Sequence, residues 1–125
     1  MDHSLKILII DDDEPVLANL CYFLRDKKYD VTTASDGLEG PELFENDQQG
    51  FDLVITDVVM PKISGTGLIS MIKKKSPDTP IIAITGWGEY PEVFAAESKA
   101  DKVLSKPFEF SELDRTINDL ISSKK

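Results

Sequence analysis

The stretch FDLVITDVVMP, residues Phe51 to Pro61, decides the fold of this chain. It is almost wholly apolar and rich in β-branched residues, which is typical of a strand buried on both faces of a parallel sheet. Within its apolar part, Leu53 to Met60, one acidic residue, Asp57, stands near the middle. An ionised carboxylate is costly in a dry interior unless it is paired, protonated or bound to a cation. We therefore expect Asp57 at the end of a strand, facing a cation.

Similar apolar runs recur along the chain, and segments with apolar residues at helical spacing separate them. The predicted strands span Leu5–Ile10, Tyr29–Ala34, Phe51–Thr56, Pro80–Thr85 and Lys102–Ser105. The predicted helices begin near Pro15, Pro41, Leu68, Pro91 and Ser111. Alternating strands and helices favour βαβ units with right-handed crossovers. The fold class is therefore α/β, with a mostly parallel sheet covered on both faces.

Three of the helices carry more specific expectations. The pair Gly40-Pro41 would interrupt a helix begun at Gly37, so the second helix is expected to be short and to start at Pro41. Ser111 followed by Asp114 resembles a capping box at the start of the last helix. The fourth helix is expected to run from Pro91 to about Ser98.

Length and charge limit the kinds of protein that the chain can be. Its 125 residues suit one domain, which we assign to residues 1–125. A formal net charge of −9 opposes direct binding to nucleic acid or to an anionic membrane. The apolar runs are too short to span a bilayer, and the first residues do not resemble a signal peptide. We expect a cytoplasmic protein.

Polar residues stand at the carboxyl ends of four predicted strands: Asp11 and Asp12, Asp57, Thr85, and Lys106. Ligands of open α/β sheets bind outside these ends, near the point where the strand order reverses. In the flavodoxin-like order 2-1-3-4-5, the first and third strands are neighbours at that point. The three aspartates are therefore expected to meet there.

Three adjacent carboxylates repel one another unless they are protonated or share a cation. A site that offers only oxygen ligands suits Mg²⁺ (or Mn²⁺). Lys106 adds a positive charge and Thr85 a hydroxyl, both suited to phosphoryl oxygens. A carboxylate nucleophile, a divalent cation, a lysine and a hydroxyl together indicate phosphoryl transfer onto an aspartate.

The ordered set ILIIDDDE, DLVITDVVMPKISG, IIAIT and KPF resembles the receiver domains of two-component response regulators, over nearly the entire chain. The resemblance implies that Asp57 accepts a phosphoryl group from the phosphohistidine of a sensor histidine kinase or of a histidine phosphotransfer protein. Asp11 and Asp12 then look like metal ligands, together with Asp57 and the backbone carbonyl of Val59. The receiver would promote its own phosphorylation and dephosphorylation and would otherwise not be an enzyme.

The same resemblance assigns roles to the remaining strand ends. Thr85 looks like the switch hydroxyl and Lys106 like the lysine that pairs with the phosphoryl group, with a cis bond to Pro107. Val103 occupies a place where the family often has an aromatic switch residue. Phosphorylation is expected to change a binding face within Pro91–Ser122, read by an unknown downstream protein or a tethered effector domain.

Two other functions fit some of the same residues. Asp11 and Asp13 form an Asp-x-Asp after a hydrophobic strand, as in phosphohydrolases of the haloacid dehalogenase type, with Asp11 as nucleophile and Asp13 as acid-base. The chain lacks an obvious cap domain and the later paired acidic motif of such enzymes. A receiver-like scaffold that is never phosphorylated is the other alternative. The identity of the phosphorylated aspartate separates these hypotheses.

Overall fold

The computed structural model of the chain describes residues 5–35, 39–46, 50–58, 65–86 and 99–123. Five strands and four helices lie in these ranges. The strands are β1 (Lys6–Ile10), β2 (Asp30–Ala34), β3 (Leu53–Asp57), β4 (Ile81–Thr85) and β5 (Lys102–Ser105). The helices are α1 (Glu14–Asp26), α2 (Glu39–Asn46), α3 (Gly65–Lys75) and α5 (Phe110–Ser123). The helix predicted over 91–98 falls outside the described residues.

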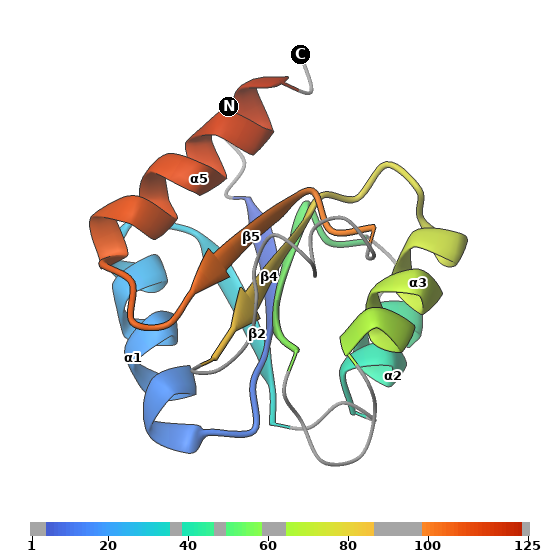
Figure 1. Cartoon of the computed structure of the whole chain (residues 1–125), viewed down its shortest axis with the longest axis horizontal. Helices are drawn as coiled ribbons and strands as arrows, with labels where there is room; N and C mark the ends of the chain where they lie inside the picture. Colours follow the sequence, from blue (N-terminus) through green and yellow to red (C-terminus); the bar gives the residue numbers. More distant parts are fainter. Residues whose placement is uncertain (1–4, 36–38, 47–49, 59–64, 87–98, 124–125) are drawn as a thin grey trace.

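The five strands form one parallel sheet in the order β2-β1-β3-β4-β5, as predicted. Figure 1 shows α1 and α5 on one side of the sheet and α2 and α3 on the other. Strand β1 has a neighbour on each side, β2 and β3, and the strand order reverses between β1 and β3. All five strands end at the same edge of the sheet, which is where the polar residues gather.

Alternate residues of each strand build two separate apolar layers. Ile7 and Ile9 of β1 pack on the side of α1 and α5, whereas Leu8 and Ile10 pack on the side of α2 and α3. All four side chains are fully buried. Side chains of a strand point alternately to opposite faces, so a strand covered on both faces needs an unbroken apolar run. This requirement explains the LKILII and IIAIT segments.

Two predicted helix starts differ from the structure. Helix α2 begins at Glu39 rather than at Pro41, since a proline is tolerated in the first turn, where its missing N–H would have no helical acceptor. It is short, as expected. Helix α5 begins at Phe110, so Ser111 lies inside the helix and the predicted capping box is wrong. The Asp114 carboxylate instead accepts a hydrogen bond from the Tyr29 hydroxyl, at 3.5 Å.

None of the helices among the described residues is long and apolar enough to cross a membrane.

Candidate functional site: an acidic cluster at the carboxyl edge of the sheet

Asp11, Asp12 and Asp57 meet at the carboxyl edge of the sheet. Each offers one carboxylate oxygen, and these oxygens lie within 4.8 Å of one another. Asp57 is the last residue of β3 and Asp11 directly follows β1; their exposed fractions are 5% and 1%. Because β1 and β3 are paired in parallel, their ends lie side by side. The strand order thus produces the cluster that the sequence predicted.

The start of α1 holds the acidic loop in place. The Asp13 carboxylate accepts a hydrogen bond from the Val16 backbone N–H at 3.3 Å, which makes Asp13 the N-cap of the helix. The Asp13 N–H in turn donates to Asp11 Oδ1 at 2.9 Å. Pro15 stands in the first turn, where no donor is required. The helix cap and the site carboxylate are therefore linked through one residue.

Lys106 brings a positive charge to two of the three carboxylates. Its Nζ lies 3.3 Å from Asp57 Oδ2 and 3.6 Å from Asp11 Oδ2. The backbone N–H of Lys106 donates to the Thr85 carbonyl at 2.8 Å, which fixes the lysine at the end of β5. The bond between Lys106 and Pro107 is cis, as expected from the sequence.

Burial and charge shift the proton affinities of this site. Burial, reinforced by the charge of Asp57, raises the pKa of the Asp11 carboxyl to about 6, although the hydrogen bond from Asp13 and the charge of Lys106 oppose the shift. Burial lowers the pKa of the Lys106 ammonium, but the charges of Asp11 and Asp57 outweigh it, and the net shift is upward. The lysine therefore stays protonated, while the site has excess negative charge.

Thr85 lies at the end of β4 and is fully buried. Its hydroxyl hydrogen-bonds toward β5: it donates to the Leu104 carbonyl at 3.4 Å and pairs with the Ser105 hydroxyl at 3.2 Å. Ser105 was not among the residues predicted from the sequence. Counting the strand register would have found it, because Thr85 and Ser105 are direct partners in the β4–β5 pairing.

The structure brings four of the predicted site residues into one cluster: Asp11, Asp12, Asp57 and Lys106. Thr85 ends the strand next to that of Asp57. Val59, whose carbonyl was predicted as a metal ligand, lies outside the described residues.

The comparison with protein families shows which family the chain belongs to. The family model of the response regulator receiver domain matches residues 7–118, nearly the whole chain. The chain is a response regulator receiver domain. Phosphorylation of a receiver domain is the general switch of two-component systems, and the residue pattern recognised in the sequence is that of this family.

Solved structures agree with this assignment. A response regulator receiver domain from Clostridium thermocellum matches the receiver domain with a TM-score of 0.88 and 36% identity, covering 96% of both chains. The response regulator protein TrrA from Thermotoga maritima, crystallised in complex with Mg(2+)-BeF, matches with a TM-score of 0.79 and 33% identity. That match covers 93% of this chain and 98% of TrrA.

Curated relatives are longer than this receiver domain. The alkaline phosphatase synthesis transcriptional regulatory protein PhoP of Bacillus subtilis is 32% identical over 117 residues, which are 93% of this chain and 48% of PhoP. The sensor kinase CckA of Brucella abortus is 30% identical over 124 residues, which are 97% of this chain and 13% of CckA. The chain thus spans less than half of these two relatives, one of which is a transcriptional regulatory protein and the other a sensor kinase.

Proposed function

We propose that this receiver domain is a phosphorylation-activated switch in which Asp57 accepts a phosphoryl group from a phosphohistidine. The main support is the buried carboxylate of Asp57 at the end of β3. Lys106 Nζ lies 3.3 Å from it, and two more carboxylates lie beside it. An ionised carboxylate buried beside two others is costly, because the neighbouring charges repel it. Such a group is well suited to act as a nucleophile toward phosphorus and to bind a cation.

The transfer step follows from these groups. A carboxylate oxygen of Asp57 attacks phosphorus, the P–N bond of the donor phosphohistidine breaks, and its electron pair returns to the imidazole nitrogen, which takes up a proton. In dephosphorylation, water attacks phosphorus and gives up a proton to solvent, the P–O bond to Asp57 breaks with its electron pair returning to the carboxylate, and phosphate leaves. The Lys106 ammonium, already within 3.3 Å of Asp57, offsets the charge of the phosphoryl oxygens in both steps. The domain thereby promotes its own phosphorylation and dephosphorylation.

The acidic cluster fits a divalent cation. Asp11 Oδ2 is buried and has no hydrogen-bond partner among the described residues, and Lys106 Nζ lies 3.6 Å from it. The carboxylates at the site provide oxygen ligands only, and oxygen is the ligand that Mg²⁺ and Mn²⁺ prefer. Asp11, Asp12 and Asp57 would hold the ion, with the Val59 carbonyl as the further ligand expected from the resemblance. When bound, the cation would neutralise phosphoryl oxygens. The Mg(2+)-BeF complex of TrrA supports this choice of metal.

The phosphodonor docks, in this proposal, on α1 and the loop after β5. An apolar hollow of about 260 Å³ lies there beside the site lysine. It is lined by Val16, Asn19, Leu20, Lys106, Pro107, Phe108 and Phe110. The ring of Phe110 stacks on that of Phe23 of α1, with centroids 4.6 Å apart, and remains partly exposed. A sensor histidine kinase or a histidine phosphotransfer protein could bury this surface and bring its phosphohistidine to Asp57.

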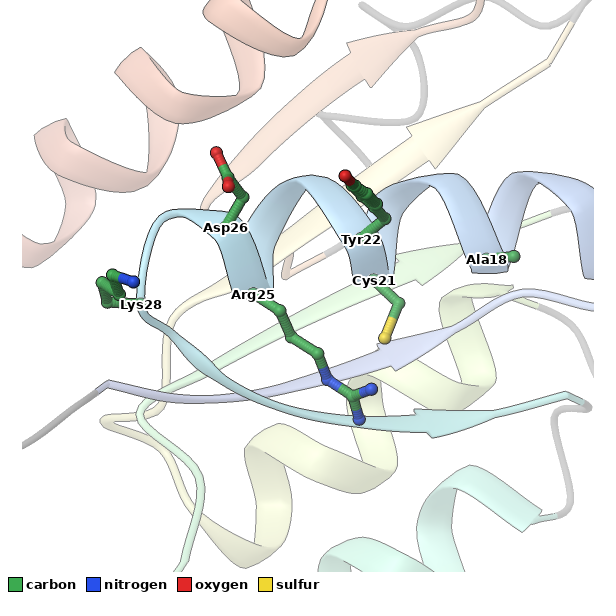
Figure 2. Close-up of a pocket in the computed structure, with 6 residues that line it drawn as sticks. All are labelled: Ala18, Cys21, Tyr22, Arg25, Asp26 and Lys28. Atoms are coloured by element: carbon green, nitrogen blue, oxygen red, sulfur yellow. The ribbon is translucent and has the colours of Figure 1, made fainter.

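A second hollow, of about 590 Å³, lies farther along α1 and contains none of the acidic cluster. Figure 2 shows Cys21 and Arg25 pointing from the helix toward β2, while Tyr22 and Asp26 point the other way. The Arg25 guanidinium donates to the Val31 carbonyl at 3.1 Å, so this side chain ties α1 to β2. Tyr22 is 70% exposed and extends the surface that we assign to the donor.

In this proposal, phosphorylation changes a binding face formed by β5 and α5 together with residues 91–98, and a downstream partner binds that face. The downstream partner is a separate protein or a tethered effector domain, as the varied relatives of the chain suggest. The domain is not expected to bind nucleic acid or an anionic membrane directly, because its net charge of −9 repels both. We place the domain in the cytoplasm, where ATP supplies the phosphoryl groups of kinases.

The test is the intact mass of the protein after incubation with acetyl phosphate, with and without Mg²⁺. Wild type is expected to gain one phosphoryl group only with Mg²⁺, and Asp57→Asn to gain none. Asp119→Asn, the same change at an exposed position of α5, is the matched control and should behave as wild type.

An adduct that persists in Asp57→Asn would favour the phosphohydrolase hypothesis, with Asp11 as nucleophile. The structure argues against that hypothesis, because the Asp13 carboxylate caps α1 rather than serving as an acid-base. Wild type that binds Mg²⁺ but takes no phosphoryl group, even from a phosphorylated histidine phosphotransfer protein, would favour the scaffold.

A further inference from the structure

The hydroxyl of Thr85 is held by the neighbouring strand. Thr85 and Ser105 are register partners in parallel strands, so their side chains project to the same face of the sheet. Their hydroxyl oxygens lie 3.2 Å apart, and Thr85 Oγ1 also lies 3.4 Å from the Leu104 carbonyl oxygen. Thr85 is fully buried, whereas Ser105 is exposed on β5, the last strand of the sheet. A buried group is thus bonded to one that solvent and partners reach.

The Thr85 hydroxyl carries a single hydrogen, so it can donate only one hydrogen bond at a time. While the Thr85 hydroxyl donates to Leu104 or to Ser105, it cannot donate to a phosphoryl oxygen on Asp57. Because a buried hydroxyl without a partner is costly, Thr85 leaves β5 only when another acceptor is present. The strength of its bonds to β5 therefore sets how readily Thr85 joins the site.

We propose that Ser105 is a positioning residue that retains the Thr85 hydroxyl on β5 in the unphosphorylated domain and releases it on phosphorylation. This inference rests on the proposed function, since it requires Thr85 to serve the phosphoryl group. The contact between the Thr85 and Ser105 hydroxyls also connects the site to the surface of the domain. Val103, on the same strand and the same face, carries no polar group and is not aromatic, so it cannot follow Thr85 as an aromatic switch residue would. The exposed Ser105 hydroxyl can report the change to a partner.

The experiment compares Ser105→Ala, which removes the hydroxyl, with Ser105→Thr, which keeps it. Ser70→Ala, at an exposed position of α3, is the matched control. The first readout is the side-chain rotamer of Thr85, from three-bond couplings to its methyl group in the unphosphorylated, Mg²⁺-free protein. The second is the rate of phosphoryl uptake from acetyl phosphate with Mg²⁺.

Loss of one hydroxyl–hydroxyl bond is expected to shift the Thr85 rotamer populations about two- to tenfold. The uptake rate in Ser105→Ala should rise by a similar factor, because a larger fraction of molecules has Thr85 free to join the site. Ser105→Thr and Ser70→Ala should match wild type in both readouts. In a Thr85→Ala background, Ser105→Ala should leave the uptake rate unchanged, which a merely structural role of Ser105 would not predict.

Unchanged couplings in Ser105→Ala would overturn the proposal, as would a rate change of the same size in the Thr85→Ala background. A different result would contradict the proposed function, namely that the wild-type protein takes up no phosphoryl group. The rotamer measurement needs no phosphorylation, so the two failures are distinguishable.

Discussion

Asp11→Asn is expected to stabilise the metal-free protein at neutral pH. Asp11 is only 1% exposed, and its pKa of about 6 lies above the usual value of 3.8. A raised pKa means that the folded state holds the proton more tightly than the unfolded state, so ionising the group disfavours folding. Asparagine removes the charge and keeps the Oδ1 atom that accepts the Asp13 N–H. The acidic cluster then contains one fewer repelling carboxylate.

The size of the effect follows from the two pKa values. Near pH 4, Asp11 is protonated in the folded state, and the variant should gain little. As the pH rises from about 4 to about 6, wild type loses stability, and the difference levels off above the folded pKa. A shift of roughly two pKa units corresponds to about 2–3 kcal/mol at pH 7. Saturating Mg²⁺ should reverse the order, because the ion stabilises wild type by binding the folded state.

Urea denaturation in EDTA at several pH values between 4 and 8 measures these differences. Asp119→Asn is the control and should change the free energy of unfolding by less than about 0.5 kcal/mol, as exposed substitutions usually do. The reasoning would be refuted if Asp11→Asn were no more stable than wild type at pH 7 in EDTA, or if its advantage did not shrink toward pH 4.

Three further predictions test other parts of the account. Lys106→Met should slow phosphoryl uptake from acetyl phosphate about ten- to a hundredfold, since it removes a charged hydrogen-bond donor from Asp57; a rate equal to that of wild type would contradict the role of Lys106. Asp13→Ala should cost about 1 kcal/mol of unfolding free energy through loss of the α1 cap, yet keep phosphoryl uptake; lost uptake in folded protein would favour Asp13 as an acid-base. Asp101→Ala should cost about 1–3 kcal/mol in urea denaturation, because Asp101 Oδ2 accepts from Lys73 Nζ and from the Ile81 N–H, both at 2.8 Å. Lys75→Ala, which breaks an exposed ion pair to Glu45, is its control and should cost much less.

Much of the fold follows from the sequence because burial on both faces imposes a simple pattern. Runs such as ILII and IIAI fit only strands with helices on both sides, and all five strands were predicted to within about two residues. The strand order then determines which residues meet, so the acidic cluster of Asp11, Asp12 and Asp57 could be predicted without coordinates.

The details that the sequence did not predict depend on contacts between distant segments. Asp114 fits a capping pattern by spacing, but Tyr29, far away in the chain, provides its actual partner. Ser105 looks like an ordinary residue until the β4–β5 register places it opposite Thr85. The first pairing depends on how α5 packs near Tyr29, and the second appears only when the β4–β5 register is counted, so neither follows from a local pattern.

The central claim is that the chemistry takes place on Asp57, and locating the phosphoryl group tests it most directly. Wild type is phosphorylated with acetyl phosphate and Mg²⁺, reduced with borohydride, which converts an aspartyl phosphate into homoserine, and sequenced by tandem mass spectrometry. The account predicts homoserine at position 57 and aspartate at positions 11, 12 and 13. Homoserine at position 11, with aspartate retained at position 57, would contradict it.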